Sequence, residues 1–96
     1  MLNVALVGCG RIAKRHSELL GLNQIKGARL VAVCDIIEEK AFNIGKNFNV
    51  PAYGDMNEMM EKEKVNIVVV LTPSGLHAKN VINLAKYGKH IIVEKP

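Results

Sequence analysis

The stretch that decides the fold is LNVALVGCGRIA, residues 2–13, in which a short apolar run ends in Gly8, Cys9 and Gly10. This GxGxxA pattern is typical of a strand that turns tightly into a helix. The first glycine permits the turn, the second lets a pyrophosphate approach the backbone, and the small Ala13 lets the helix pack on the sheet. Free N–H groups at the start of such a helix bind phosphate. Taken alone, the pattern also fits a plain strand-to-helix turn.

Asp35 supplies the second part of a nucleotide-binding pattern. It follows the apolar run RLVAVC, residues 29–34, at the end of the second predicted strand. An acidic side chain about 20 residues past the glycines accepts hydrogen bonds from the adenosine ribose, and its charge repels a 2′-phosphate. The two motifs together predict a dinucleotide site that favours NAD over NADP, with Lys40 as the one nearby basic residue that could soften the preference. The alternative is an ordinary turn or helix-capping aspartate.

The rest of the chain alternates in the same way between short apolar runs and segments with helical spacing. Strands that are apolar on both faces belong in a parallel sheet covered by helices. The order predicts an α/β fold, a doubly wound parallel Rossmann sheet with strand order 3-2-1-4-5. In the last helix, Ala78, Val81, Ile82 and Ala85 form the stripe expected to face the sheet. We expect strands at 2–7, 29–34, 52–53, 66–71 and 90–93, and helices at 11–21, 37–48, 55–63 and 75–87.

Composition excludes several classes of protein. Ninety-six residues, 49% hydrophobic and 23% charged, make one folded domain and not a disordered chain. The 13 basic residues are scattered and only four residues are aromatic, which argues against a nucleic-acid surface. Two cysteines make no disulfide framework or metal site, and no apolar run approaches the roughly 20 residues of a membrane span. We therefore expect a cytoplasmic protein that binds no metal, nucleic acid or membrane.

Two groups of sulfur-containing residues could be taken for functional residues, but core packing explains them better. Cys9 and Cys34 lie near the ends of neighbouring predicted strands, and nothing in their surroundings indicates an activated thiolate. Met56, Met59 and Met60 recur with helical spacing, which favours a core stripe. We interpret all five as buried packing residues.

A polar loop follows the predicted strand 66–71 and lies across the switch point from the glycine turn. Its residues Thr72, Pro73 and His77 are therefore expected to line the cofactor cleft. Part of the segment has a structural explanation, because Pro73 fixes φ and Ser74 can cap the next helix. For His77 the sequence leaves open whether it is a site residue or a histidine at a helix start.

Glu94 and Lys95 follow the last predicted strand, at the edge of the sheet where the nicotinamide ring is expected. A lysine beside a positively charged nicotinamide has a lowered pKa, which suits proton transfer or the orientation of a hydroxyl. From its position alone, Lys95 could equally be an ordinary solvated lysine with no role in the site.

Four segments together resemble the glucose-fructose oxidoreductase and inositol dehydrogenase family, Gfo/Idh/MocA. They are GCGRIAKRH at 8–16, VCD at 33–35, LTPSGLHAKN at 71–80 and GKHIIVEKP at 88–96, the terminal EKP being the most specific. The resemblance covers essentially the whole sequence. It implies an NAD(P)-dependent dehydrogenase that acts on a hydroxyl of a sugar, a cyclitol or a nucleotide-activated sugar. By this resemblance Lys95 is the candidate catalytic residue, and the candidate cofactor-binding residues are Gly8, Gly10, Arg11, Ile12, Asp35, Ile36, Leu71, Thr72, Pro73, His77, Glu94 and Lys95.

The resemblance also implies that something is missing, because family members continue into a sixth strand and a C-terminal substrate domain that usually carries a catalytic histidine. We expect residues 1–96 to be the dinucleotide-binding domain of such an enzyme, with weak NAD binding and little or no turnover when alone. The strand at 90–93 would then be a sheet edge that pairs with a second copy, giving a homo-oligomer. The alternative function is a non-catalytic nucleotide-binding or sensing module.

Overall fold

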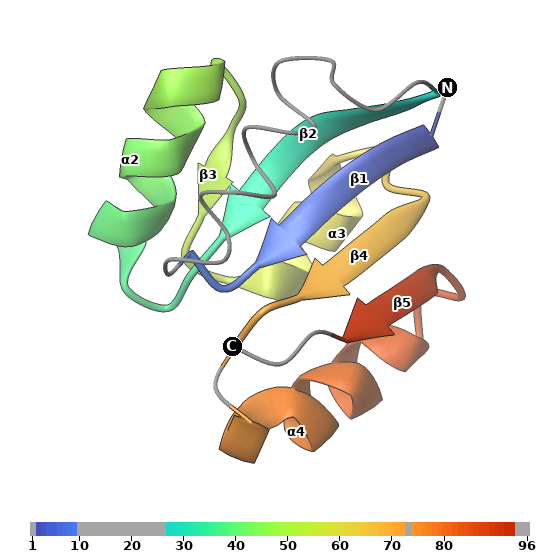
Figure 1. Ribbon diagram of the computed structural model, residues 1–96. Coiled ribbons are helices and arrows are strands. Elements are labelled where there is room, and N and C mark those ends of the chain that lie inside the picture. Colours follow the sequence, from blue (N-terminus) through green and yellow to red (C-terminus); the bar gives the residue numbers. More distant parts are fainter. Residues whose placement is uncertain (1, 10–26, 73, 94–96) are drawn as a thin grey trace.

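One parallel sheet organises the chain. The computed structural model describes residues 2–9, 27–72 and 74–93, with the backbone alone at 74, 75 and 77 (Figure 1). The strand order is β3-β2-β1-β4-β5, and every pair of neighbours is parallel. This confirms the predicted Rossmann topology. The strands are β1 (Leu2–Val7), β2 (Ala28–Cys34), β3 (Ala52–Tyr53), β4 (Ile67–Val70) and β5 (His90–Val93).

Among the described residues, helices follow β2, β3 and β4. They are α2 (Glu38–Phe48), α3 (Met56–Lys62) and α4 (Ser74–Ala85). α3 begins where the Asp55 carboxylate accepts a hydrogen bond from the Asn57 N–H, and α2 ends at Asn49, whose φ of 55° is left-handed. The helix predicted at 11–21 lies outside the described residues.

The core has two halves, one on each face of the sheet, because alternate residues of a strand point to opposite faces. Val4 and Leu6 of β1 pack with Ala41 and Ile44 of α2. The opposite face packs against α3 and α4, and Figure 1 places α3 behind the sheet. Met59 and Met60 are buried there, which confirms the prediction of core packing; Met56 is half-buried at the edge of this cluster.

α4 faces the sheet with a different side from the one predicted. Ile82, expected to be inward, is 73% exposed, and Ala78 and Ala85 are also exposed. Leu84 is fully buried instead, with the half-buried Asn80 one turn earlier. The apolar stripe did not predict the inward face because that face of α4 carries the polar Asn80, whose side chain finds hydrogen-bond partners.

β5 forms one edge of the sheet, paired only with β4 among the described residues. Ile92 and Val93 are 47% and 44% exposed. The predicted apolar edge is therefore present, and association of a second copy through it stays a prediction. In the part of the chain that the structure describes, no helix is both long enough and apolar enough to cross a membrane.

Candidate functional site

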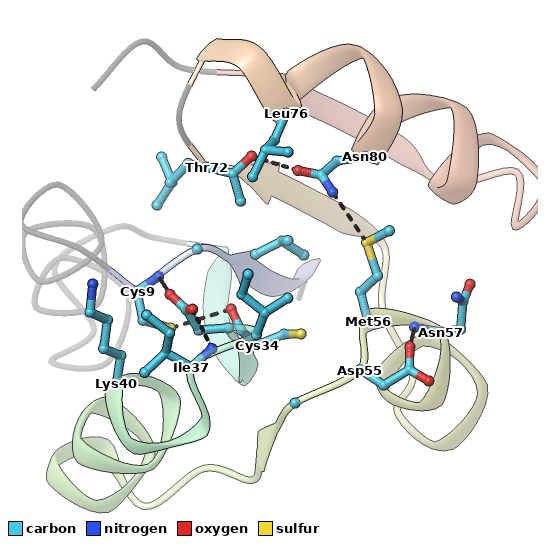
Figure 2. Close-up of a pocket in the computed structure, with 16 residues that line it drawn as sticks. Cys9, Cys34, Ile37, Lys40, Asp55, Met56, Asn57, Thr72, Leu76 and Asn80 are labelled. Carbon is cyan, nitrogen blue, oxygen red and sulfur yellow. Dashed lines mark hydrogen bonds between the residues drawn. The ribbon is translucent and has the colours of Figure 1, made fainter.

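A cleft of about 640 Å³ opens at the carboxyl ends of β1, β2 and β4 (Figure 2). Ligands of open α/β sheets bind at this edge, where the connections from neighbouring strands run to opposite sides. The cleft is bounded by the β2–α2 turn on one side and by α3 and α4 on the other. Of the residues predicted from sequence, those that line it are Gly8, Asp35, Ile36, Leu71 and Thr72.

Gly8 joins the two central loops of this cleft. Its φ is +101°, and its N–H donates a hydrogen bond of 2.7 Å to the Cys34 carbonyl. A Cβ at this position would lie 2.8 Å from the backbone nitrogen of Thr72 and 2.9 Å from the carbonyl carbon of Leu71. Both the backbone conformation and the space therefore require glycine, as expected for the first glycine of the turn.

Asp35 connects the glycine turn to the start of α2. Its Oδ2 accepts a hydrogen bond of 2.8 Å from the Cys9 N–H, and its Oδ1 accepts one of the same length from the Ile37 N–H. Cys9 is only 7% exposed, so its N–H would otherwise be buried without a partner. The turn aspartate that was the alternative is thus present, and it does not exclude the ribose role. Each carboxylate oxygen retains a lone pair, and the half-buried side chain lines the cleft.

Cys9 and Cys34 lie beneath the cleft as free, buried thiols. The Cys9 Sγ–H donates to the Cys34 carbonyl at 3.4 Å. Burial, reinforced by the charge of Asp35, raises the pKa of each thiol to about 12. The burial of both side chains confirms the prediction that they pack, and the raised pKa keeps both thiols protonated at neutral pH.

Sequence reasoning did not find the wall of the cleft that α3 and α4 form. Asn80 and Leu76 of α4 and Met56 and Asn57 of α3 line this wall. The Tyr87 hydroxyl donates to Asn57 Oδ1 at 2.9 Å, which ties the two helices together. The one available signal was the position of Met56, Asn57 and Leu76 near the starts of helices that follow β3 and β4, since helix starts lie at the carboxyl edge of a parallel sheet. Asn80 lies in the middle of α4 and carried no such signal.

Gly10, Arg11, Ile12, Pro73, Glu94 and Lys95 lie outside the described residues, and His77 lies in α4 with only its backbone described. Among the described side chains, no group of three or more His, Cys, Asp or Glu residues is placed to hold a metal ion.

The described residues fit a nucleotide. Small-molecule sites are clefts of roughly 300–1,000 Å³ with apolar walls and few polar groups, and this cleft has that character. Ile36, 83% exposed, and Leu76, 39% exposed, offer aliphatic surface from its two sides. The Asp35 carboxylate places hydrogen-bond acceptors in the cleft beside the glycine turn.

Comparison with known proteins points the same way. Residues 2–96 match the family model Gfo/Idh/MocA, described as an oxidoreductase family with an NAD-binding Rossmann fold. The chain is 31% identical over 93 residues to scyllo-inositol 2-dehydrogenase (NAD(+)) of Bacillus subtilis, covering 96% of this chain and 27% of that protein. It is 33% identical over 96 residues to myo-inositol 2-dehydrogenase of Thermotoga maritima, covering 99% of this chain and 28% of that protein.

Solved structures agree in fold and in sequence. The WlbA dehydrogenase of Chromobacterium violaceum, in complex with NADH and UDP-GlcNAcA, superposes with a TM-score of 0.88 at 34% identity over 99% of this chain and 27% of that one. GenD2 from gentamicin A biosynthesis, in complex with NAD, gives a TM-score of 0.88 at 28% identity over 99% of this chain and 27% of its own. The chain thus spans little more than a quarter of the length of these relatives.

Replacing Gly8 with alanine is expected to destabilise the fold by about 3 kcal/mol, because the added methyl group meets rigid backbone and φ is positive. Gly27→Ala is the matched control: its φ is also positive, at +81°, but no atom of the described residues lies within 4 Å of the added Cβ. That variant should lose only about 1 kcal/mol. Urea unfolding followed by circular dichroism measures both, and equal losses would refute the importance of the Gly8 contact.

Both thiols are expected to resist alkylation by iodoacetamide at pH 8 in the folded chain. A pKa of about 12 instead of 9.0 lowers the thiolate fraction about a thousandfold. The chain unfolded in urea should react rapidly, and the variants Cys9→Ser and Cys34→Ser assign each site. Because the folded pKa is the higher one, this contribution to stability is complete below pH 9 and declines as the pH rises toward 12. Rapid alkylation of Cys9 in the folded chain would contradict the assignment.

Proposed function

Because this chain belongs to the Gfo/Idh/MocA oxidoreductase family, with its NAD-binding Rossmann fold, we propose that it is the dinucleotide-binding part of a dehydrogenase. The substrate class is a sugar, a cyclitol or a nucleotide sugar. The observation that carries this proposal is the glycine turn at Gly8, hydrogen-bonded through Cys9 to Asp35 at the mouth of the cleft. The names of the relatives, which include inositol dehydrogenases and a complex with UDP-GlcNAcA, support the substrate class.

The order of the strands in the sheet predicts which part of the dinucleotide would lie at the end of each strand. Asp35 at the end of β2 would accept the hydroxyls of the adenosine ribose, and the turn after β1 would hold the pyrophosphate. Gly10, Arg11 and Ile12 follow that turn in sequence and would complete the phosphate contacts. A negative charge at Asp35 repels a 2′-phosphate, so the site would prefer NAD to NADP.

The bound nicotinamide would supply the acceptor or donor of hydride, while the chain orients the reacting groups. β4 and β5 pair in the register Val70 to Val93, so both strands end at the same edge as the cleft. Lys95 follows β5 by two residues, and we propose that it orients the substrate hydroxyl and assists its proton transfer. The relatives are more than three times as long, so further structure, in the same or another polypeptide, would complete the substrate site.

The preference for NAD is tested by calorimetry on the chain with each cofactor. We expect NAD to bind at least about tenfold more tightly than NADP, and Asp35→Asn to shift the ratio of the two dissociation constants at least about tenfold toward NADP. The ratio cancels any damage to the glycine turn, because both cofactors carry the same pyrophosphate. Glu39→Gln, which removes an exposed charge from α2, should leave the ratio unchanged. Tighter binding of NADP by the unaltered chain would overturn the role of Asp35.

The role of Lys95 is tested in the complete dehydrogenase with a sugar or cyclitol alcohol as substrate. Lys95→Ala should lower kcat at least about a hundredfold, the usual contribution of a positioned acid or base, with little change in the dissociation constant of NAD. Lys89→Ala, a change of an exposed lysine just before β5, is the control and should keep full turnover. Unchanged turnover of Lys95→Ala would assign catalysis to another group. NAD binding by a wild-type protein that oxidises no alcohol would favour a sensing module.

A further inference from the structure

Asn80 holds the hydroxyl of Thr72 at the wall of the cleft. The Thr72 Oγ1–H donates a hydrogen bond of 2.5 Å to Asn80 Oδ1, and the Asn80 Nδ2 lies 3.9 Å from the Met56 sulfur (Figure 2). The sulfur fixes which way the amide points, because a thioether accepts weakly from N–H and offers nothing to an oxygen. All three side chains are half-buried and line the cleft.

This contact decides what Thr72 can offer a ligand. A hydroxyl carries one hydrogen and two lone pairs, and here the hydrogen is committed to Asn80. Toward the cleft, Thr72 therefore presents an acceptor and no donor. The polar group that it fits must carry a hydrogen of its own.

The surroundings identify the part of the nucleotide that would lie there. Thr72 and Leu76 stand on the α4 side of the cleft, and Ile37 stands on the opposite side (Figure 2). Aliphatic surface on two sides suits a planar base. Asp35, the ribose acceptor of the proposed function, lines the same cleft, which places the adenine next to these walls.

We propose that Asn80 is a positioning residue that makes Thr72 an acceptor for the 6-amino group of adenine, and so gives the site selectivity for adenine over hypoxanthine. Hypoxanthine carries a 6-oxo group, and two acceptors facing each other in a partly buried site leave both unpaired. This inference rests on the proposed function, since it takes the ligand to be NAD.

The experiment compares the dissociation constants of NAD and nicotinamide hypoxanthine dinucleotide, measured on the 96-residue chain by ligand-observed NMR. The wild-type chain should prefer NAD about tenfold, the value of roughly one hydrogen bond. In Asn80→Leu the freed hydroxyl can turn its hydrogen to the 6-oxo group, so the preference should fall to about twofold. Thr72→Val should lose the preference equally, and Thr72→Ser, which keeps the hydroxyl, should retain it. Lys79→Leu, an exposed change on α4, is the control.

The outcomes distinguish a failure of the proposed function from a failure of the role given to Asn80. A wild-type chain that binds neither dinucleotide contradicts the proposed function. A wild-type chain that binds NAD, with a preference that survives in Asn80→Leu, overturns the inference alone. In the double variant Asn80→Leu with Thr72→Val, the loss should be no larger than in either single variant, and additive losses would show that Asn80 does not act through Thr72. If Asn80→Leu fails to fold, the comparison of Thr72→Val with Thr72→Ser decides whether the Thr72 hydroxyl is the acceptor, and equal preferences in the two variants would overturn the inference.

Discussion

The close approach of the Gly8 backbone to the backbone of Leu71 and Thr72 is the constraint on which the site depends. β1 and β4 are neighbours in the sheet. The connection from β1 runs to β2 on one side and the connection from β4 runs to β5 on the other, so the two loops diverge at the centre of the sheet. A Cβ at position 8 would fall 2.8 Å from the Thr72 nitrogen. Because that atom is absent, the two loops meet at the floor and the cleft opens above them.

Asp35 adds a second constraint, because its carboxylate holds the glycine turn and, in the proposed function, would also bind the ribose. The buried N–H of Cys9 needs an acceptor, and the carboxylate comes from the next strand, β2. The same carboxylate keeps lone pairs for a ribose. One side chain therefore holds the glycine turn in shape and provides the charge that would distinguish NAD from NADP.

The sequence could predict those parts of the site that strand ends determine, but not those that helix orientation determines. The strands 2–7 and 90–93 were predicted with the observed bounds, the strand at 52–53 was predicted with flanking residues that the structure leaves out of it, and Gly8, Asp35 and Thr72 follow from motifs at strand ends. The predicted strand 66–71 is one residue too long at each end, although the Leu71 N–H still bonds to the Val7 carbonyl. The rotation of α4 about its axis was missed, because the apolar stripe was expected to face the sheet, whereas the inward face carries the polar Asn80.

Asn80 on the inward face of α4 and Tyr87 in the turn after the helix explain why the apolar stripe did not predict which face packs on the sheet. A half-buried amide or phenol is tolerated only where its polar atoms are paired. Asn80 of α4 pairs with Thr72 in the loop after β4 and contacts Met56 of α3, and Tyr87, in the turn after α4, pairs with Asn57 of α3. Hydrogen bonds are directional, whereas apolar contacts tolerate sliding. The wall of the cleft is thus set by directed bonds, which fix the Thr72 hydroxyl in one orientation before any ligand arrives.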